Sequence, residues 1–240
     1  MAYLKRFGIA FASVFLVYLG VLIYPQPLFN YYIAYQNYKV WSDRPIPPDI
    51  THVLDDVIRR LKTSTLYEPD RPLRIFFCNA SWRLWLYGHF SNKMAGIADT
   101  CLARNIYIRE SDITLNTIHP PNSKPLTDAE HRPLSYFIAH EATHIIESWR
   151  FGRFAFMRHP LWVSEGYADY VGKGGDFDFD ENRKLLIEND PLMDVQKSGV
   201  YRRFHLEVFF LLHKKGFAVD TIFAHPPREE DVIAEIKALP

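Results

Sequence analysis

The sequence predicts an α+β protein in which a small mixed sheet lies over a central helix, a helical lobe follows, and one transmembrane helix precedes the domain. An uncharged run of 18 residues, Phe7 to Tyr24, lies near the N-terminus. Short strand-like segments follow in the front half, and apolar residues at helical spacing dominate after residue 133. We therefore divide the chain into a membrane anchor (residues 1–28), an aromatic and proline-rich linker (29–48) and one domain (49–240).

The N-terminal run predicts an uncleaved signal-anchor. At a rise of 1.5 Å per residue, Phe7–Tyr24 would span about 27 Å as a helix, close to the hydrocarbon thickness of a bilayer. Tyr24-Pro25-Gln26-Pro27 follows it in place of an Ala-x-Ala-like cleavage site. The basic pair Lys5-Arg6 should remain cytoplasmic, which predicts a single-pass membrane protein with its domain on the outer side, periplasmic or extracellular. A buried helix of the domain is the alternative.

The composition argues for one core and against a nucleic-acid partner. The chain has 240 residues, of which 48% are hydrophobic, enough for a sizeable core. Its 28 basic and 28 acidic residues leave no basic excess to neutralise phosphates, so we expect no nucleic-acid binding. Cys78 and Cys101 are the only cysteines, and either one disulfide or two free thiols is consistent with them.

The front half of the domain predicts one helix and a few strands. Asp49 can cap a helix over residues 50–61, where apolar side chains recur at helical spacing. Leu73–Cys78 and Arg104–Arg109 have strand patterns, and Ile113–Ile118 is a third candidate. The aromatic residues of the linker could form an interfacial belt or pack onto the domain, and both alternatives remain open. They are Tyr31, Tyr32, Tyr35, Tyr38 and Trp41.

A helix is expected over Pro133–Arg150. Proline is tolerated only near a helix start, so the regular helix should begin around Arg132–Leu134. Thr127–Glu130 ahead of it is a capping-box pattern, suited to a short preceding turn. An apolar stripe would bury the helix against a sheet. The stripe consists of Phe137, Ile138, Ile145 and Ile146.

This helix carries the pattern His-Glu-x-x-His at residues 140–144. Residues four apart lie on one face of a helix, so His140 and His144 can offer imidazole nitrogens to a single metal ion. Glu141 would point into the same cleft, beside the position of a metal-bound water. A structural helix with two surface histidines would also explain the pentapeptide, so the motif alone does not decide the matter.

A second stretch, Trp162–Tyr170, supplies the rest of a metal site. Glu165 follows His144 after 20 intervening residues, enough for a reversal of the chain and a second helix. Gly166 would let that helix approach the first closely. Asp169 lies one turn past Glu165, placed to accept a hydrogen bond from the non-ligating nitrogen of a ligand histidine. Two histidines, a glutamate ligand, a base and a further carboxylate together predict a Zn2+ site.

In this order the motifs resemble those of the gluzincin metallopeptidases, the thermolysin-like class whose zinc is held by two histidines and one glutamate. The resemblance covers roughly Leu126–Gly216, with a weaker match in the helix Tyr201–Gly216. The Gly-x-Met-Glu-Asn motif of the related aminopeptidases is absent from the sequence, so capture of a free N-terminus is not expected. The matching residues are His140, Glu141, His144, Glu165 and Asp169.

The resemblance implies a zincin-like fold with the small sheet over the active-site helix. In that family the edge strand of the sheet pairs with an extended substrate, a form of β-augmentation, and Ile106–Ile108 or Gly96–Ala98 is the expected edge here. Tyr201 and His205 lie one helical turn apart, and either could donate a hydrogen bond to the oxyanion, as a Tyr or His does in gluzincins. The alternative for them is a core tyrosine and a surface histidine.

We therefore expect a membrane-anchored zinc metallopeptidase that acts on peptide or protein substrates. His140, His144 and Glu165 would hold Zn2+ and leave a fourth position for water, and Glu141 would act as the general base on that water. Two alternatives remain. One is a catalytically silent zincin that acts as an envelope binding protein. The other is a zinc amidase that cleaves a non-protein amide.

Overall fold

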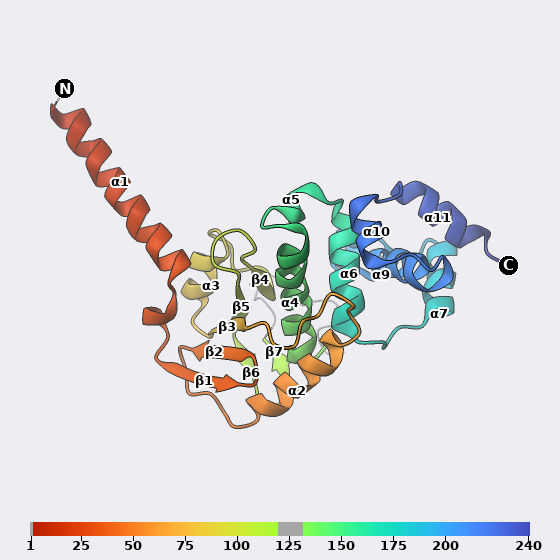
Figure 1. The fold of residues 1–240 in the computed structure, drawn as a ribbon, viewed down its shortest axis with the longest axis horizontal. Coiled ribbons are helices and arrows are strands. Elements are labelled where there is room, and N and C mark those ends of the chain that lie inside the picture. Colours follow the sequence, from red (N-terminus) through yellow and green to blue (C-terminus); the bar gives the residue numbers. More distant parts are fainter. Residues whose placement is uncertain (1, 120–131) are drawn as a thin grey trace.

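The computed structural model describes residues 2–119 and 132–240, with side chains for residues 11–119, 132–154 and 157–240. The capping-box pattern at 127–130 lies outside the described residues. The fold is mixed α/β. Figure 1 shows the sheet on one side of α4 (Leu134–Phe151) and most of the other helices on its opposite side, toward the C-terminus.

The sheet has five strands among the described residues. β2 pairs in parallel with β3, and β3 with β5, whereas β1 and β4 run antiparallel to their neighbours. Because β4 is an edge strand in contact with α4 and β5 is interior, the edge beside α4 is Gly96–Ala98 and not Ile106–Ile108. In spatial order the strands are β1 (Tyr31–Tyr35), β2 (Tyr38–Ser42), β3 (Leu73–Cys78), β5 (Asn105–Arg109) and β4 (Gly96–Ala98).

Strand β3 is apolar on both faces because both faces are covered. Ile75 and Phe77 lie in the main core with residues of α2 (Ile50–Leu61) and α4. Phe76, between them, lies in a second core with residues of α3 (Ser81–Tyr87). A strand buried on both faces loses the alternation of polar and apolar residues, which accounts for the near-continuous apolar run of its sequence.

The helical lobe follows α4. α6 (Leu161–Lys173) packs against α4, and α9 (Arg202–Phe209) packs against α6. Gly166 lies at this second contact and not, as its sequence position suggests, at the first. A Cβ at Gly166 would lie 2.4 Å from the carbonyl oxygen of Phe204, so only glycine fits there. Shorter elements complete the domain: β6 (Ser111–Asp112), β7 (Thr117–Ile118), α5 (Ala155–Arg158), α7 (Phe179–Ile187), η3 (Pro191–Met193), α8 (Val195–Ser198), η4 (Phe210–Lys214), α10 (Val219–Ala224) and α11 (Glu229–Ala238).

Residues 29–48, expected to be a linker, contribute to the sheet. β1 and β2 form a hairpin, and β2 pairs in parallel with β3. Tyr38 is fully buried, and Trp41 stacks on Phe76 with the ring centroids 4.7 Å apart. Tyr38 and Trp41 therefore pack onto the domain, whereas Tyr31 and Tyr32 are exposed on β1. The sheet extends ahead of residue 49.

The structure also tests the predictions made for the Asp49 cap, the strand at 113–118 and the two cysteines. Asp49 makes no capping hydrogen bond from its side chain and instead accepts one from the Thr114 hydroxyl at 3.1 Å. Of the candidate strand Ile113–Ile118, only its last two residues form a strand, β7. Cys78 and Cys101 are both free thiols, which settles the alternatives left open by their number.

The prediction of a transmembrane helix is wrong. α1 (Ala2–Ile23) is helical and projects from the domain (Figure 1), and η1 (Gln26–Leu28) follows it. A membrane span needs a long and predominantly apolar helix, and no helix formed by the described residues is long and apolar enough to qualify. The structure therefore also contradicts two predictions that depend on this helix: a signal-anchor, and a single-pass membrane localisation with the domain on the outer side. The C-terminal part of α1 packs on the domain, where Leu22 is buried in the second core.

Candidate metal centre

Helix α4 positions the His-Glu-x-x-His motif. Pro133 is its N-cap residue, with an extended backbone, and the helix begins at Leu134 as the proline predicts. The apolar stripe predicted for the helix lies in the main core. The histidines lie at the cleft, beside Phe137, and are largely shielded from solvent: His140 is 8% exposed and His144 6%.

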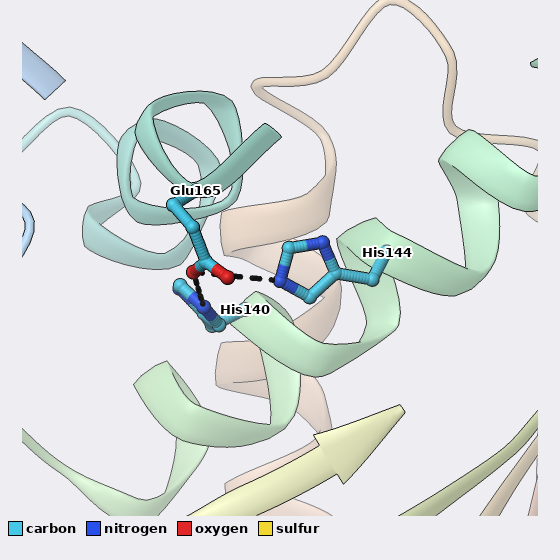
Figure 2. A group of neighbouring side chains, drawn as sticks. All are labelled: His140, His144 and Glu165. Atoms are coloured by element: carbon cyan, nitrogen blue, oxygen red, sulfur yellow. Dashed lines mark hydrogen bonds and ion pairs between the residues drawn. The ribbon is translucent and has the colours of Figure 1, made fainter. Parts of the chain in front are cut away.

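Helix α6 brings Glu165 to the two histidines (Figure 2). The Nε2 atom of His140 lies 3.2 Å from Oε2 of Glu165, and Nε2 of His144 lies 3.7 Å from the same oxygen. Two ligand atoms about 2.1 Å from a tetrahedral ion lie about 3.4 Å apart, which matches both distances. The three buried side chains can therefore hold a metal ion, since one donor atom from each lies within 4.8 Å of the others.

The protonation of this group fits a cation site. Burial would raise the pKa of Glu165, but His144 and His140 hold it below the ordinary value of a glutamate. Burial would lower the pKa of His144, but Glu165 and Glu147 raise it well above its ordinary value. The negative surroundings thus favour a positive charge between the side chains, and a divalent cation can replace the imidazole proton there.

Glu141 lies between the metal ligands and strand β4. A Cβ added to Gly96 would lie 2.8 Å from Cγ of Glu141 and 3.1 Å from its Oε1, so the carboxylate packs directly on the backbone of the strand. Burial raises the pKa of Glu141, while His140, His144 and a hydrogen bond from the Ala98 backbone oppose that shift. A carboxylate with raised proton affinity beside a metal site is suited to accept a proton.

A cleft of about 670 Å³ runs between β4 and α4 and contains the metal group. One wall is formed by residues 93–102 and the other by α4 from Tyr136 to His144. The peptide groups along β4 point alternately toward β5 and away from it. Asp99 donates to the carbonyl of Asn105 at 2.8 Å, and the Ala95 carbonyl accepts from Arg109 at 3.1 Å, so the peptide groups of residues 96 and 98 face away from β5, toward the cleft.

The two candidate oxyanion donors, Tyr201 and His205, have different surroundings in the structure. Tyr201 lines the cleft and its ring is stacked near that of His140, with centroids 5.9 Å apart. Burial, followed by the Glu165 and Glu141 carboxylates, raises the pKa of the Tyr201 phenol, so its hydroxyl remains a donor. His205 is only 1% exposed, and its ring stacks on Phe177 at 3.7 Å. It is neither a surface histidine nor part of the described cleft lining.

Asp169 has different partners from those its spacing predicts. Its Oδ2 lies 2.9 Å from Nδ1 of His205, and its Oδ1 accepts a hydrogen bond from the Tyr136 hydroxyl. Burial would raise the pKa of Asp169, but its bond with His205 holds that pKa below the ordinary value. Nδ1 of His140 has no hydrogen-bond partner among the described residues, so the expected hydrogen bond from this histidine to Asp169 is not formed.

Two residues beside His144 are not anticipated by the sequence argument. Glu147 lies three residues further along α4, and Ser164 directly precedes Glu165. The Ser164 hydroxyl donates to Oε2 of Glu147 at 2.6 Å, and both side chains approach Nδ1 of His144, at 3.5 Å for Ser164 and 3.7 Å for Glu147. The available signal was an acidic residue directly after the apolar pair Ile145-Ile146 on a helix expected to be buried.

Comparison with protein-family models, with curated proteins and with solved structures found no match to this chain. The geometry of the site and the chemistry of its residues therefore carry the functional interpretation. The donor set comprises two imidazoles and one carboxylate on two packed helices, with a further carboxylate and a tyrosine hydroxyl at the same cleft.

Proposed function

We propose that this chain is a zinc-dependent metallopeptidase that hydrolyses peptide bonds in an extended peptide or protein segment. One observation carries the proposal. Nε2 of His140 and Nε2 of His144 face the same oxygen of Glu165, and the half-buried Glu141 carboxylate lies beside them in an open cleft. These four residues are among the five that carry the resemblance to the gluzincins, which supports the assignment; the fifth, Asp169, contacts His205 and Tyr136 instead.

Zinc is the metal that suits these donors best. Two imidazoles and one carboxylate are a typical catalytic zinc set, whereas Ca2+ and Mg2+ prefer oxygen ligands only. When bound, zinc supplies Lewis acidity: it lowers the pKa of a water molecule and polarises a carbonyl group. His140, His144 and Glu165 would hold the ion at the wall of the cleft, where a water and a substrate have access.

Glu141 is the general base in this proposal. It accepts a proton from the attacking water as the water oxygen bonds to the carbonyl carbon, and it returns that proton to the amine nitrogen as the C–N bond breaks. The Ala98 backbone and Gly96 hold the carboxylate in place.

The substrate backbone and the developing oxyanion have their own partners. The outward-facing peptide group of residue 96 and the outward-facing carbonyl of Ala98 can pair with an extended chain that lies along β4, while the Ala98 N–H is already bonded to Glu141. The Tyr201 hydroxyl lines the same cleft and can donate a hydrogen bond to the carbonyl oxygen as negative charge develops there. His205 is not among the described residues that line this cleft, so we assign the donor role to Tyr201.

The proposal is tested by metal analysis and proteolysis on the same preparations. Wild-type protein loaded with zinc is incubated with unfolded proteins and with quenched fluorescent peptides. We expect about one equivalent of zinc and steady hydrolysis, and loss of both in His140→Ala. Zinc binding without hydrolysis of any peptide would favour the silent binding protein, and hydrolysis restricted to non-peptide amides would favour the amidase. Absence of metal from the wild-type protein would overturn the proposal.

A further inference from the structure

We propose that Glu147, acting together with Ser164, is the residue that orients His144 toward the metal. This inference rests on the proposed metal centre and adds a positioning residue to it. It assigns the role predicted for Asp169 to a different carboxylate, on the same helix as the histidines.

The ring of His144 lies between two carboxylates. Its Nε2 is 3.7 Å from Oε2 of Glu165 on one side, and its Nδ1 is 3.7 Å from Oε2 of Glu147 on the other. A neutral imidazole can bind a metal through Nε2 only if Nδ1 carries the proton. That proton needs an acceptor on the far side of the ring, and ligand histidines commonly donate it to a carboxylate.

Ser164 completes the link between Nδ1 and the carboxylate. Its hydroxyl hydrogen is used in the bond to Glu147 at 2.6 Å, so its oxygen lone pairs remain free to accept from Nδ1 of His144, 3.5 Å away. Because Ser164 directly precedes Glu165, the same turn of α6 places a metal ligand on one side of His144 and a hydroxyl on the other.

The burial of Glu147 supports the assignment independently. The residue is 1% exposed, its Oε1 has no hydrogen-bond partner among the described residues, and Ile145 and Ile146 precede it on the helix. Burying a carboxylate is unfavourable unless a positive charge compensates it. A divalent cation held between His140, His144 and Glu165 would supply positive charge close to Glu147, on the other side of the His144 ring.

The two ligand histidines are held differently in this arrangement. Nδ1 of His140 has no hydrogen-bond partner among the described residues, and its ring lies against those of Tyr136 and Tyr201. His140 is thus held by aromatic packing, whereas His144 is held by the polar side chains of Ser164 and Glu147. A change at Glu147 should therefore weaken the metal site through His144 alone.

The test measures metal affinity of the full chain by competition with a chromophoric chelator. Glu147→Gln should weaken zinc binding about 10- to 100-fold, the usual effect of removing such a partner, and should shift the visible absorption of the Co2+-loaded protein. Glu207→Gln is the matched control, since Glu207 is also fully buried, on α9, and is paired with Arg203 at 3.0 Å. We expect wild-type affinity and an unchanged cobalt spectrum in the control.

Two further variants keep the test decisive. Ser164→Ala retains the Glu147 carboxylate but removes the hydroxyl that links it to Nδ1 of His144, so this variant should also weaken zinc binding. The double variant should bind zinc no more weakly than Glu147→Gln alone. If Glu147→Gln does not fold, Ser164→Ala decides the question. Wild-type affinity in these variants, with the wild-type protein itself binding zinc, would overturn this inference alone. A wild-type protein without metal would overturn the proposed function and this inference together.

Discussion

Replacing Gly96 by alanine should disable the general base while leaving the metal in place. The added Cβ would lie 2.8 Å from Cγ of Glu141 and 3.0 Å from Cδ1 of Ile108. Carbon atoms prefer a separation of about 3.5–4.0 Å, so the Glu141 side chain must move by roughly 1 Å. A misplacement of that size near reacting atoms costs about 100-fold in rate.

The metal ligands are not touched by this change, so zinc content should stay at the wild-type value. The substitution should lower kcat about 100-fold and KM little, because the displaced group acts on the water and does not hold the substrate. The protein should lose about 1–3 kcal/mol of stability, as is usual for overpacking. Gly20→Ala is the control, since nothing lies within 4 Å of a Cβ at that position. A wild-type kcat in Gly96→Ala would refute the placement of Glu141.

Two further predictions concern the metal site, and a third concerns the buried Glu207. Glu165→Ala should lose most of the zinc, because two imidazoles alone bind far more weakly; a full equivalent of zinc in the purified variant would show that Glu165 is not a ligand. Tyr201→Phe should keep its zinc and lose about 100- to 1,000-fold in kcat, the usual cost of one oxyanion donor, and an unchanged kcat would remove Tyr201 from the site. Burial raises the pKa of Glu207 from 4.5 to about 9, so the folded protein retains this proton and its stability should fall as the pH rises from about 4.5 toward 9. Between pH 5 and pH 8.5, thermal unfolding should show a smaller loss of stability in Glu207→Gln than in the wild type. Equal losses of stability would contradict the raised pKa of Glu207.

The parts of the site that the sequence predicts correctly depend on local geometry. The histidines of α4 share a helix face because they are four residues apart, and Pro133 marks the helix start. Strands β3 and β5 lie where their apolar patterns place them, within a residue at each end. In each case the deciding interactions are made by residues close together in the sequence.

The parts that the sequence does not predict depend on contacts between distant segments. Asp169 has the spacing of a histidine partner, but α9 brings His205 to it from 36 residues away. The hairpin β1–β2 joins the sheet through parallel pairing with β3, in a register that sets Val40 against Ile75, and no local pattern reveals such pairing. The uncharged length of residues 7–24 favoured a membrane span, which no described helix supports.

The most direct measurement compares zinc content and peptidase rate in wild-type protein and in Glu141→Gln, on the same preparations. An amide fills the same space as the carboxylate and can still form a hydrogen bond, but it cannot accept the proton. The variant should therefore bind a full equivalent of zinc and lose about 100- to 10,000-fold in rate. Full activity in Glu141→Gln would contradict the proposed metallopeptidase mechanism, and loss of zinc would show that Glu141 is a ligand and not the base.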